Sequence, residues 1–377
     1  MKKYINYICL SSCFIICGCI IEFSPKGIDE TSDILVVEGL ITDYESIITL
    51  SRSSHLTDER WSGWSLSSYV LDAEVYIEEC DDSNVINEWR ANIDIQSLPP
   101  RYTIENGKLD PNSRYRLRIE IEETEETNIY FSELSYPIIT PEIDSIFWMK
   151  RPGHQVMIYV ASQSHNNENM YYCRSFREDW EIQSLFYIED YPFYCWNYLI
   201  NNELLLFSNE RTVSGQSVGI ITNIDPTHRK LSTLYRITVK QNALSKRAYD
   251  YFSNIKKNVV QTSGIFAPIP SELRGNIFCE NDPNIPVIGF VEVSTTTQNH
   301  KFIAQSDGAY EEIIRSACIP ILESDLVEYY GEVPRNYVLL PDPPELDAPP
   351  PHYVQIQCVD CTFFGTEDVP DDWPYNL

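Results

Sequence analysis

Short runs of alternating hydrophobic and polar residues recur from Ile34 onward, and this period of two is the pattern of half-buried β-strands. Asp, Asn, Ser, Gly and Pro residues separate the runs, as expected for turns. The pattern predicts strands near residues 34–42, 46–53, 73–79, 85–90, 101–105, 114–121 and 128–136. Short strands of this number and spacing indicate an immunoglobulin- or fibronectin III-like β-sandwich over residues 34–140.

Residues 109–115 (LDPNSRY) support this fold. They resemble the Leu-x-Pro-x-Ser/Thr-x-Tyr corner of fibronectin type III domains, in which the tyrosine hydroxyl bonds back to the turn backbone. Tyr115 also begins an alternating run with Leu117 and Ile119. We therefore expect a tyrosine corner here, with an unrelated turn as the alternative.

A second β-rich domain is predicted over residues 141–340, after a boundary marked by Tyr136-Pro137 and Thr140-Pro141. It begins with the apolar segment 143–149. Further strands are predicted near 155–161, 170–179, 203–208, 217–222, 234–241, 285–295 and 300–305. The fold class is thus mainly β.

One amphipathic helix is predicted near residues 245–259, packed across a sheet end. Ser245 can cap its N-terminus, and apolar residues recur at spacings of three and four to form one face. These residues are Ala248, Tyr251, Phe252, Ile255 and Val259.

The chain ends in a predicted strap and tail over residues 341–377. The strap, residues 341–351 (PDPPELDAPPP), is too rich in proline for a sheet interior and should run extended. Alternation returns at residues 353–358 before a polar tail that contains Trp373. The strap should therefore lead to a segment that docks.

The N-terminus has the pattern of a lipoprotein signal peptide over residues 1–18. Lys2 and Lys3 precede an apolar stretch from Ile5 to Ile16, which is too short to span a bilayer as a helix. Cys19 follows small residues, so we expect it to be lipidated and to become the mature N-terminus, with residues 19–33 as a tether. The protein should then be anchored to a membrane without crossing it.

The chain is strongly acidic, with a net charge of −28, and the loss of Lys2 and Lys3 with the signal makes the mature form more so. A chain of this charge repels phosphate backbones, so nucleic acid is excluded as a partner. The acids are spread along the sequence, which favours a solvated surface over a cation site.

Seven cysteines remain after the signal and Cys19 are set aside, and an exported protein favours disulfides. The Cys358-x-x-Cys361 pair allows a redox or zinc reading, but structural bridging fits its surroundings better. The odd number leaves at least one thiol free, and the pairing stays open. The candidates for structural disulfides are Cys173, Cys195, Cys279, Cys318, Cys358 and Cys361.

Catalytic patterns are weak. Residues 215–219 (GQSVG) match the Gly-x-Ser-x-Gly nucleophile motif, but the β-branched run after Ser217 leaves no room for the helix that this motif requires. The histidines form no metal-binding spacing, and Asp81-Asp82-Ser83-Asn84 lacks the glycine and spaced acids of a calcium loop. We expect a protein that is not an enzyme, with no cofactor and no metal.

Aromatic residues are the best candidates for binding. Trp61 and Trp64, with Tyr69, lie in a serine-rich loop with little core to fill, so contact with a ligand or with the neighbouring domain is expected. Aromatic residues also crowd segment 171–198. Core packing explains many of them, while Trp180, Tyr191 and Trp196 are candidates for ligand or partner contact.

The whole mature chain resembles the Bacteroidetes outer-membrane lipoproteins catalogued as domain of unknown function 4249. The resemblance begins with the lipobox and the opening strand 35–39, and continues through residues 73–75, 109–115 and 141–145. Its most specific block extends from Ala243 to Phe290, and Cys358-x-x-Cys361 with Gly365 and Trp373 resembles the family's C-terminus. No catalytic residues come with it.

The resemblance implies an accessory, ligand-binding lipoprotein of a TonB-dependent nutrient-uptake system, because members tend to be encoded beside such receptors. A free-standing adhesive or structural surface lipoprotein is the alternative. Glu22 is the one acid directly after Cys19, so the cell-surface and periplasmic faces of the outer membrane stay open.

Overall fold

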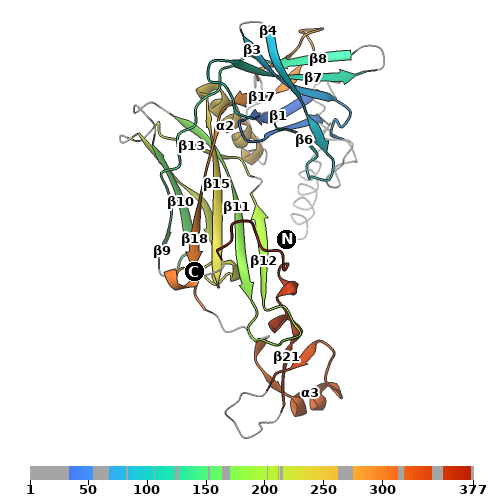
Figure 1. Cartoon of the computed structure of the whole chain (residues 1–377), viewed down its shortest axis with the longest axis vertical. Coiled ribbons are helices and arrows are strands. Elements are labelled where there is room, and N and C mark those ends of the chain that lie inside the picture. The colour runs from blue at the N-terminus through green and yellow to red at the C-terminus, as the bar shows by residue number, and fades with distance from the viewer. Residues whose placement is uncertain are drawn as a thin grey trace, which may run out of the picture.

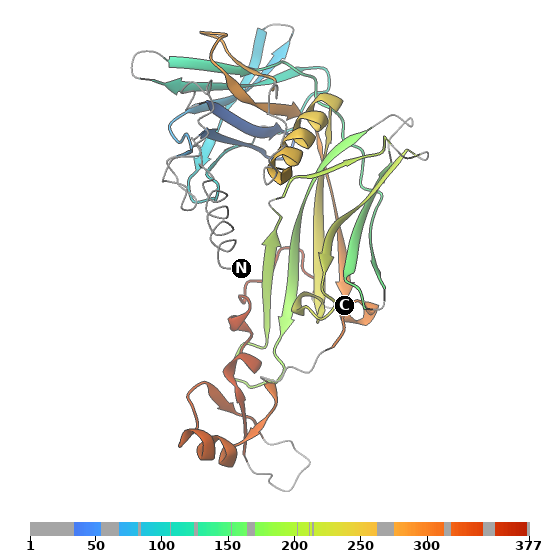
Figure 2. The ribbon, with the colours of Figure 1, turned by 180° about the vertical axis from the view of Figure 1, so that it is seen from behind.

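The structure is a computed structural model of the whole chain. It describes residues 34–53, 68–81, 84–105, 107–123, 127–151, 153–163, 170–201, 203–210, 212, 215–261, 275–312, 318–341 and 351–374. Three β-rich bodies follow one another along the long axis: an N-terminal sandwich, a larger second sandwich and a small C-terminal unit (Figure 1, Figure 2). The mainly β fold predicted from the sequence is confirmed.

The N-terminal sandwich consists of two five-stranded sheets. The first has the order β17-β1-β2-β6-β5, with β17 (Val287–Val293), β1 (Leu35–Ile41), β2 (Ser46–Arg52), β6 (Arg101–Ile104) and β5 (Asn92–Asp94). The second has the order β16-β8-β7-β3-β4, with β16 (Ile277–Cys279), β8 (Thr127–Ser132), β7 (Arg114–Glu122), β3 (Glu74–Asp81) and β4 (Asn84–Arg90).

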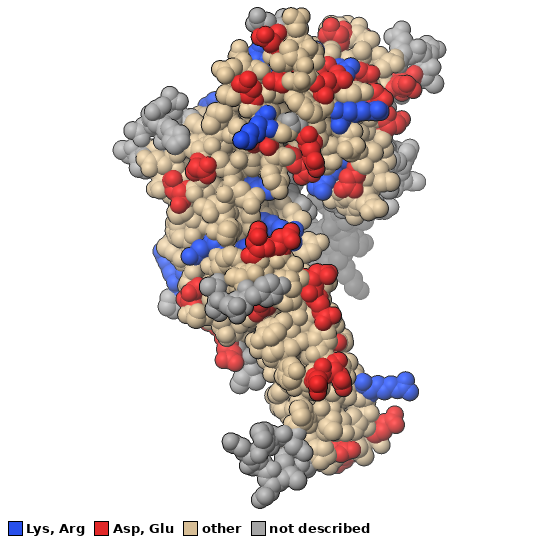
Figure 3. Space-filling model, in the orientation of Figure 1, with Lys and Arg blue, Asp and Glu red and all other residues tan. Residues whose placement is uncertain are grey.

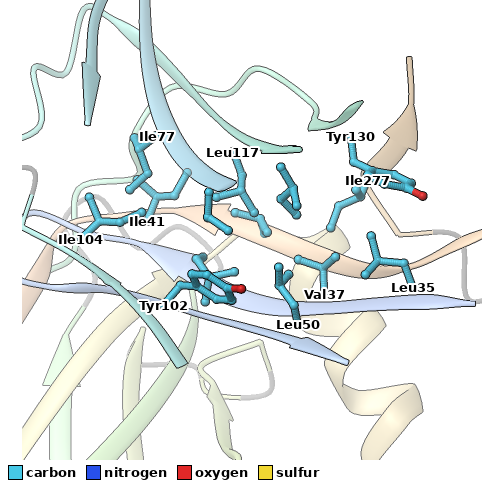
Figure 4. Packing of buried hydrophobic residues seen from close by; sticks show 14 of the residues in the cluster. Leu35, Val37, Ile41, Leu50, Ile77, Tyr102, Ile104, Leu117, Tyr130 and Ile277 are labelled. Carbon is cyan, nitrogen blue, oxygen red and sulfur yellow. The ribbon is translucent and has the colours of Figure 1, made fainter. Parts of the chain in front are cut away.

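The core of this sandwich is formed by the hydrophobic residues that alternate with polar ones along its strands. Along β7, every second residue from Tyr115 to Ile121 is buried, while the residues between them are more exposed. Figure 4 shows Leu117 and Ile77 of one sheet facing Val37 and Leu50 of the other. The apolar faces thus meet as a packed interior.

Two strands of this sandwich come from far along the chain. β17 pairs in parallel with β1, and β16 pairs antiparallel with β8. Gly289 lies opposite Val37, where a Cβ atom would stand 2.3 Å from the Val37 carbonyl oxygen, so β17 needs glycine at this position. The chain therefore enters the second sandwich and returns, and the predicted boundary at residue 140 does not separate two contiguous domains.

The second sandwich has a three-stranded sheet of order β14-β10-β9 and a larger sheet of order β12-β11-β15-β18, in which β13 also pairs with β11. The small sheet is formed by β9 (Ser145–Lys150), β10 (Val156–Gln163) and β14 (Gln216–Ile224). The large sheet is formed by β11 (Tyr171–Gln183), β12 (Tyr194–Ile200), β13 (Leu205–Ser208), β15 (Leu234–Leu244) and β18 (Thr296–Ala304). Ile158, Ile237 and other buried residues fill the space between them.

Helix α2 (Lys246–Gln261) joins the two sandwiches. The Ser245 hydroxyl accepts the Ala248 N–H at 3.1 Å, which is the predicted cap. Tyr251 packs on Phe290 of the N-terminal sandwich, and the same cluster includes Tyr171 and Leu244 of the second. The predicted helix and its position at a sheet end are confirmed.

The C-terminal unit has a three-stranded sheet of order β19-β21-β20 and helix α3 (Glu323–Tyr330). Its strands are β19 (Ile321–Leu322), β20 (Tyr337–Leu339) and β21 (His352–Gln355). Most of the proline-rich strap, residues 342–350, lies outside the described residues, between β20 and β21. Figure 3 shows acidic side chains and very few basic ones over this lower part of the molecule.

Candidate functional site

Two disulfides stabilise the C-terminal part of the chain, one within the C-terminal unit and one to the second sandwich. Cys361 is bonded to Cys195 of β12, across 166 residues, and Cys358 is bonded to Cys318, across 40 residues. The two cysteines of the Cys-x-x-Cys motif therefore face different partners and not each other. The structural reading of this motif is confirmed.

The predicted bridging of Cys173 and Cys279 is wrong, since both are free thiols in the structure, as is Cys80. Cys173 packs beside α2, whereas Cys279 belongs to the core of the N-terminal sandwich, so the two lie in different clusters. Burial raises the pKa of the Cys173 thiol to about 11, so it stays protonated at neutral pH.

The C-terminal tail docks on the large sheet of the second sandwich. Trp373 is only 5 % exposed, and its indole N–H donates to Glu181 Oε2 at 3.3 Å. Arg236 donates to the Asp371 carbonyl oxygen at 2.7 Å, and Thr366 pairs with Trp196 of β12. The expectation that the strap leads to a docking segment is confirmed.

The tail covers one part of a surface that we call the outer face and leaves the rest of it exposed. The outer face is the side of the large sheet that points away from the sandwich core, because Trp180, Tyr235 and Ile303 point into that core and their strand neighbours point the other way. The strand register aligns its residues in two rows. They are Tyr198, Asp179, Arg236 and Phe302, and then Ile200, Arg177, Thr238 and His300.

Charges and aromatic rings are paired along the outer face. The buried Asp179 carboxylate accepts from Arg177 Nε at 2.8 Å and from Arg236 at 2.9 Å. The Arg177 guanidinium also lies 4.5 Å from the Tyr198 ring centroid. Asp179 thus holds the exposed Arg177 side chain beside the exposed Tyr198 ring, and the two form a preorganised surface. Arg236 is mostly buried, with its guanidinium 5.5 Å from the Trp373 ring centroid of the tail.

Tyr44 of the N-terminal sandwich borders the outer face at its other end. The Lys240 ammonium lies 3.9 Å from the Tyr44 ring centroid, and burial lowers the pKa of Lys240. Tyr44, Tyr198 and His300 are all exposed. Aromatic rings can stack on a planar or sugar-like group, and the N–H groups of cations beside them can donate hydrogen bonds to an anion.

A small cavity of about 150 Å³ lies where the second sandwich meets the C-terminal unit. Cys318 and Cys361 line it, as do Phe364 and Arg229, whose guanidinium lies 3.2 Å from the Phe364 ring centroid. Its volume is well below the usual range for small-molecule sites, so we assign it to the junction and not to a ligand.

The predicted binding residues have different fates. Cys19, Trp61 and Trp64 lie outside the described residues, and Tyr69 forms a backbone bridge with Ser51. Trp180 is 7 % exposed and belongs to the core between the sheets, so the prediction that it contacts a ligand is wrong. Tyr191 packs against the C-terminal unit, and Trp196 pairs with the tail.

The outer face includes residues that the sequence analysis missed. Tyr198 lies in the aromatic segment but was not singled out, and Tyr44, Arg177 and His300 gave no signal of their own. They lie far apart in the sequence and come together only through strand pairing.

The remaining chemical candidates do not gather into a site. Ser217 lies inside β14, and its hydroxyl is buried without a hydrogen-bond partner. Within the described ranges, no three His, Cys, Asp or Glu side chains are grouped to hold a metal ion. None of the helices described is long and apolar enough to cross a bilayer.

Fold and surface together define a class of protein: tandem β-sandwiches joined by one helix, with a flat aromatic and cationic face. A family model described as a domain of unknown function (DUF4249) matches residues 20–300, and the chain belongs to this family. The resemblance seen in the sequence is thereby confirmed, and the C-terminal unit lies beyond the matched residues. No curated protein matches the chain.

Proposed function

We propose that this protein is an outer-membrane-anchored lipoprotein without enzymatic activity that serves a TonB-dependent nutrient-uptake system. It captures a ligand for the receptor or docks onto it. The lipobox before Cys19 supports the lipid anchor, and membership in the family supports the proposed link to a nutrient-uptake system. The observation that carries the binding role is the outer face, where Asp179 holds Arg177 beside the exposed Tyr198 ring.

A pull-down from native outer membranes in mild detergent, followed by mass spectrometry, tests the proposal. We expect a TonB-dependent receptor to be recovered in stoichiometric amount. The variant Tyr198→Ala/His300→Ala should lower that recovery at least tenfold. Tyr136→Ala/His154→Ala, which changes exposed residues of the same types outside the outer face, is the matched control and should leave recovery unchanged.

A clean protein with no receptor would contradict the uptake role and favour the alternative, a free-standing adhesive or structural lipoprotein. Loss of lipid labelling in Cys19→Ala tests the anchor separately. A serine-directed fluorophosphonate probe should not label the protein, because the Ser217 hydroxyl is buried within a strand; labelling would contradict the non-enzymatic role.

A further inference from the structure

The turn between β5 and β6 exposes large aliphatic side chains. In residues 95–100 (IQSLPP), Ile95 is 61 % exposed and Leu98 is 72 % exposed, and none of the six side chains is charged. Leu71, in the neighbouring segment after Val70, is 37 % exposed. In a protein with a net charge of −28, an uncharged loop that exposes two large aliphatic side chains is a candidate contact surface.

The polar groups of this loop are bonded to the loop itself. The Asp94 carboxylate accepts the Gln96 N–H at 3.0 Å and the Ser97 N–H at 3.2 Å. The Ser97 hydroxyl lies 2.9 Å from the Asp94 carbonyl oxygen and 2.8 Å from that of Pro99. Because the polar side chains stabilise the turn, Ile95 and Leu98 are already held outward, and little conformational entropy is lost when they are buried.

The loop lies at the end of the sheet where the described chain begins. Leu35 pairs with Arg52 at that end of β2, and the Ile34 N–H donates to Ser53 Oγ at 3.0 Å. β6 runs antiparallel to β2, so its first residue, Arg101, points toward the same end, and the loop precedes it directly. The 95–100 loop and the start of β1 are therefore on the same side of the N-terminal sandwich.

We propose that the 95–100 loop is a second membrane contact, in which Ile95 and Leu98 insert into the bilayer surface beside the lipid anchor. This rests on the proposed lipidation of Cys19. Residues 20–33 connect that cysteine to Ile34 and span at most about 50 Å when extended, so the anchor keeps this end of the sheet within that distance of the lipid. At such a high effective concentration, two or three aliphatic side chains are enough to fix the orientation of the molecule.

A depth measurement on the lipidated full-length protein tests this contact. A fluorophore is attached to Gln96→Cys, and the protein is reconstituted into phosphatidylcholine vesicles with brominated acyl chains, which quench only groups that enter the bilayer. The matched probe is at Asn84→Cys, at the opposite end of β4 from β5. We expect quenching at 96 to exceed quenching at 84 at least threefold, after subtraction of labelling at the native thiols.

The substitution Ile95→Ser/Leu98→Ser should abolish the excess quenching at 96, whereas Val85→Ser/Ile86→Ser, which removes two exposed aliphatic residues from β4, should not. Equal quenching of the two probes in vesicle-bound protein would overturn the membrane contact. If the protein does not float with vesicles, the anchor has failed instead. In that case, a histidine tag at position 19 tethers the protein to nickel-chelating vesicles. The same comparison of quenching at positions 96 and 84 then tests whether the 95–100 loop contacts the membrane.

Discussion

Tyr115 shows how much one side chain can connect. Its hydroxyl accepts the Asp110 N–H at 2.7 Å and donates to Glu79 Oε1 at 3.1 Å, so it links the turn before β7 to β3. Leu109 of the same motif is also buried. The tyrosine corner predicted from residues 109–115 is confirmed, and its second partner on β3 is a feature that the motif did not contain.

Replacing Tyr115 with Phe should lower the free energy of unfolding by about 1–3 kcal/mol, because the Asp110 N–H loses its acceptor and the Glu79 carboxylate loses a donor. Urea denaturation measures the change. Tyr136→Phe, at an exposed tyrosine, should change stability by less than about 0.5 kcal/mol. A loss at Tyr115 no larger than that at Tyr136 would contradict the structural role of the corner.

Stability should fall in alkaline solution between about pH 10 and pH 12. Burial raises the pKa of Tyr115 to about 12 and that of Tyr251 to about 12, while an unfolded tyrosine ionises near pH 10. The folded state therefore holds these protons more tightly, and the stabilisation present below pH 10 is lost as the pH rises through 12. In Tyr115→Phe, the decline measured by thermal melts across this range should be shallower.

At the scale of elements, the C-terminal tail is attached to the large sheet of the second sandwich. β12 carries Cys195, which the tail reaches through Cys361, and Trp373 covers the neighbouring part of the same sheet. The tail therefore covers the part of the outer face that includes Arg236 and Phe302. A segment without a large core of its own is thus fixed to the second sandwich by the Cys195–Cys361 bond and one buried indole, while Cys318–Cys358 closes the C-terminal unit itself.

The two disulfides should contribute unequally. Cys195→Ala/Cys361→Ala opens a loop of 166 residues, whereas Cys318→Ala/Cys358→Ala opens one of 40, so loop-closure entropy predicts a loss about 1 kcal/mol larger for the first pair. Urea unfolding of both variants under oxidising conditions compares them. An equal or reversed order would show that the bridges do not act mainly on the unfolded chain.

Most strands could be predicted from the sequence because each buries one face, so that hydrophobic and polar residues alternate along it. β7 and β15 are examples, with nearly every second residue buried. β12 was missed because its aromatic residues lie on the more exposed face and Cys195 is the one buried residue of the strand. α3 was missed because Leu326 is its one buried residue, so no apolar face repeats along it. Short strands such as β16 are set by their neighbours and carry too few residues for a pattern.

At the scale of the whole molecule, the three bodies extend along one axis, with α2 between the first two (Figure 2). The N-terminal sandwich depends on residues that follow the second one, since Val291 and Val293 of β17 and Ile277 of β16 complete its core. The two sandwiches are therefore tied together by chain topology as well as by the helix.

A fragment of residues 34–140 should not fold cooperatively, because β1 loses its parallel neighbour β17 and β8 loses β16. Thermal melts followed by circular dichroism, together with amide NMR dispersion, test this. The control joins residues 34–140 to 275–295 through a flexible linker and should melt in a single transition. A folded 34–140 fragment would mean that the returning strands are additions to a complete sandwich.

The amino-acid sequence alone was enough for the β class, the tyrosine corner, the capped helix and the family, because each depends on local periodicity or on a short motif. The disulfide pairing, the return of β16 and β17 and the outer face required the tertiary structure. Arg174 shows why: it resembles a surface cation in sequence, yet it is buried and donates to Gln241 and Ser162 from other strands. Contacts between distant segments depend on register, and no local pattern encodes that register.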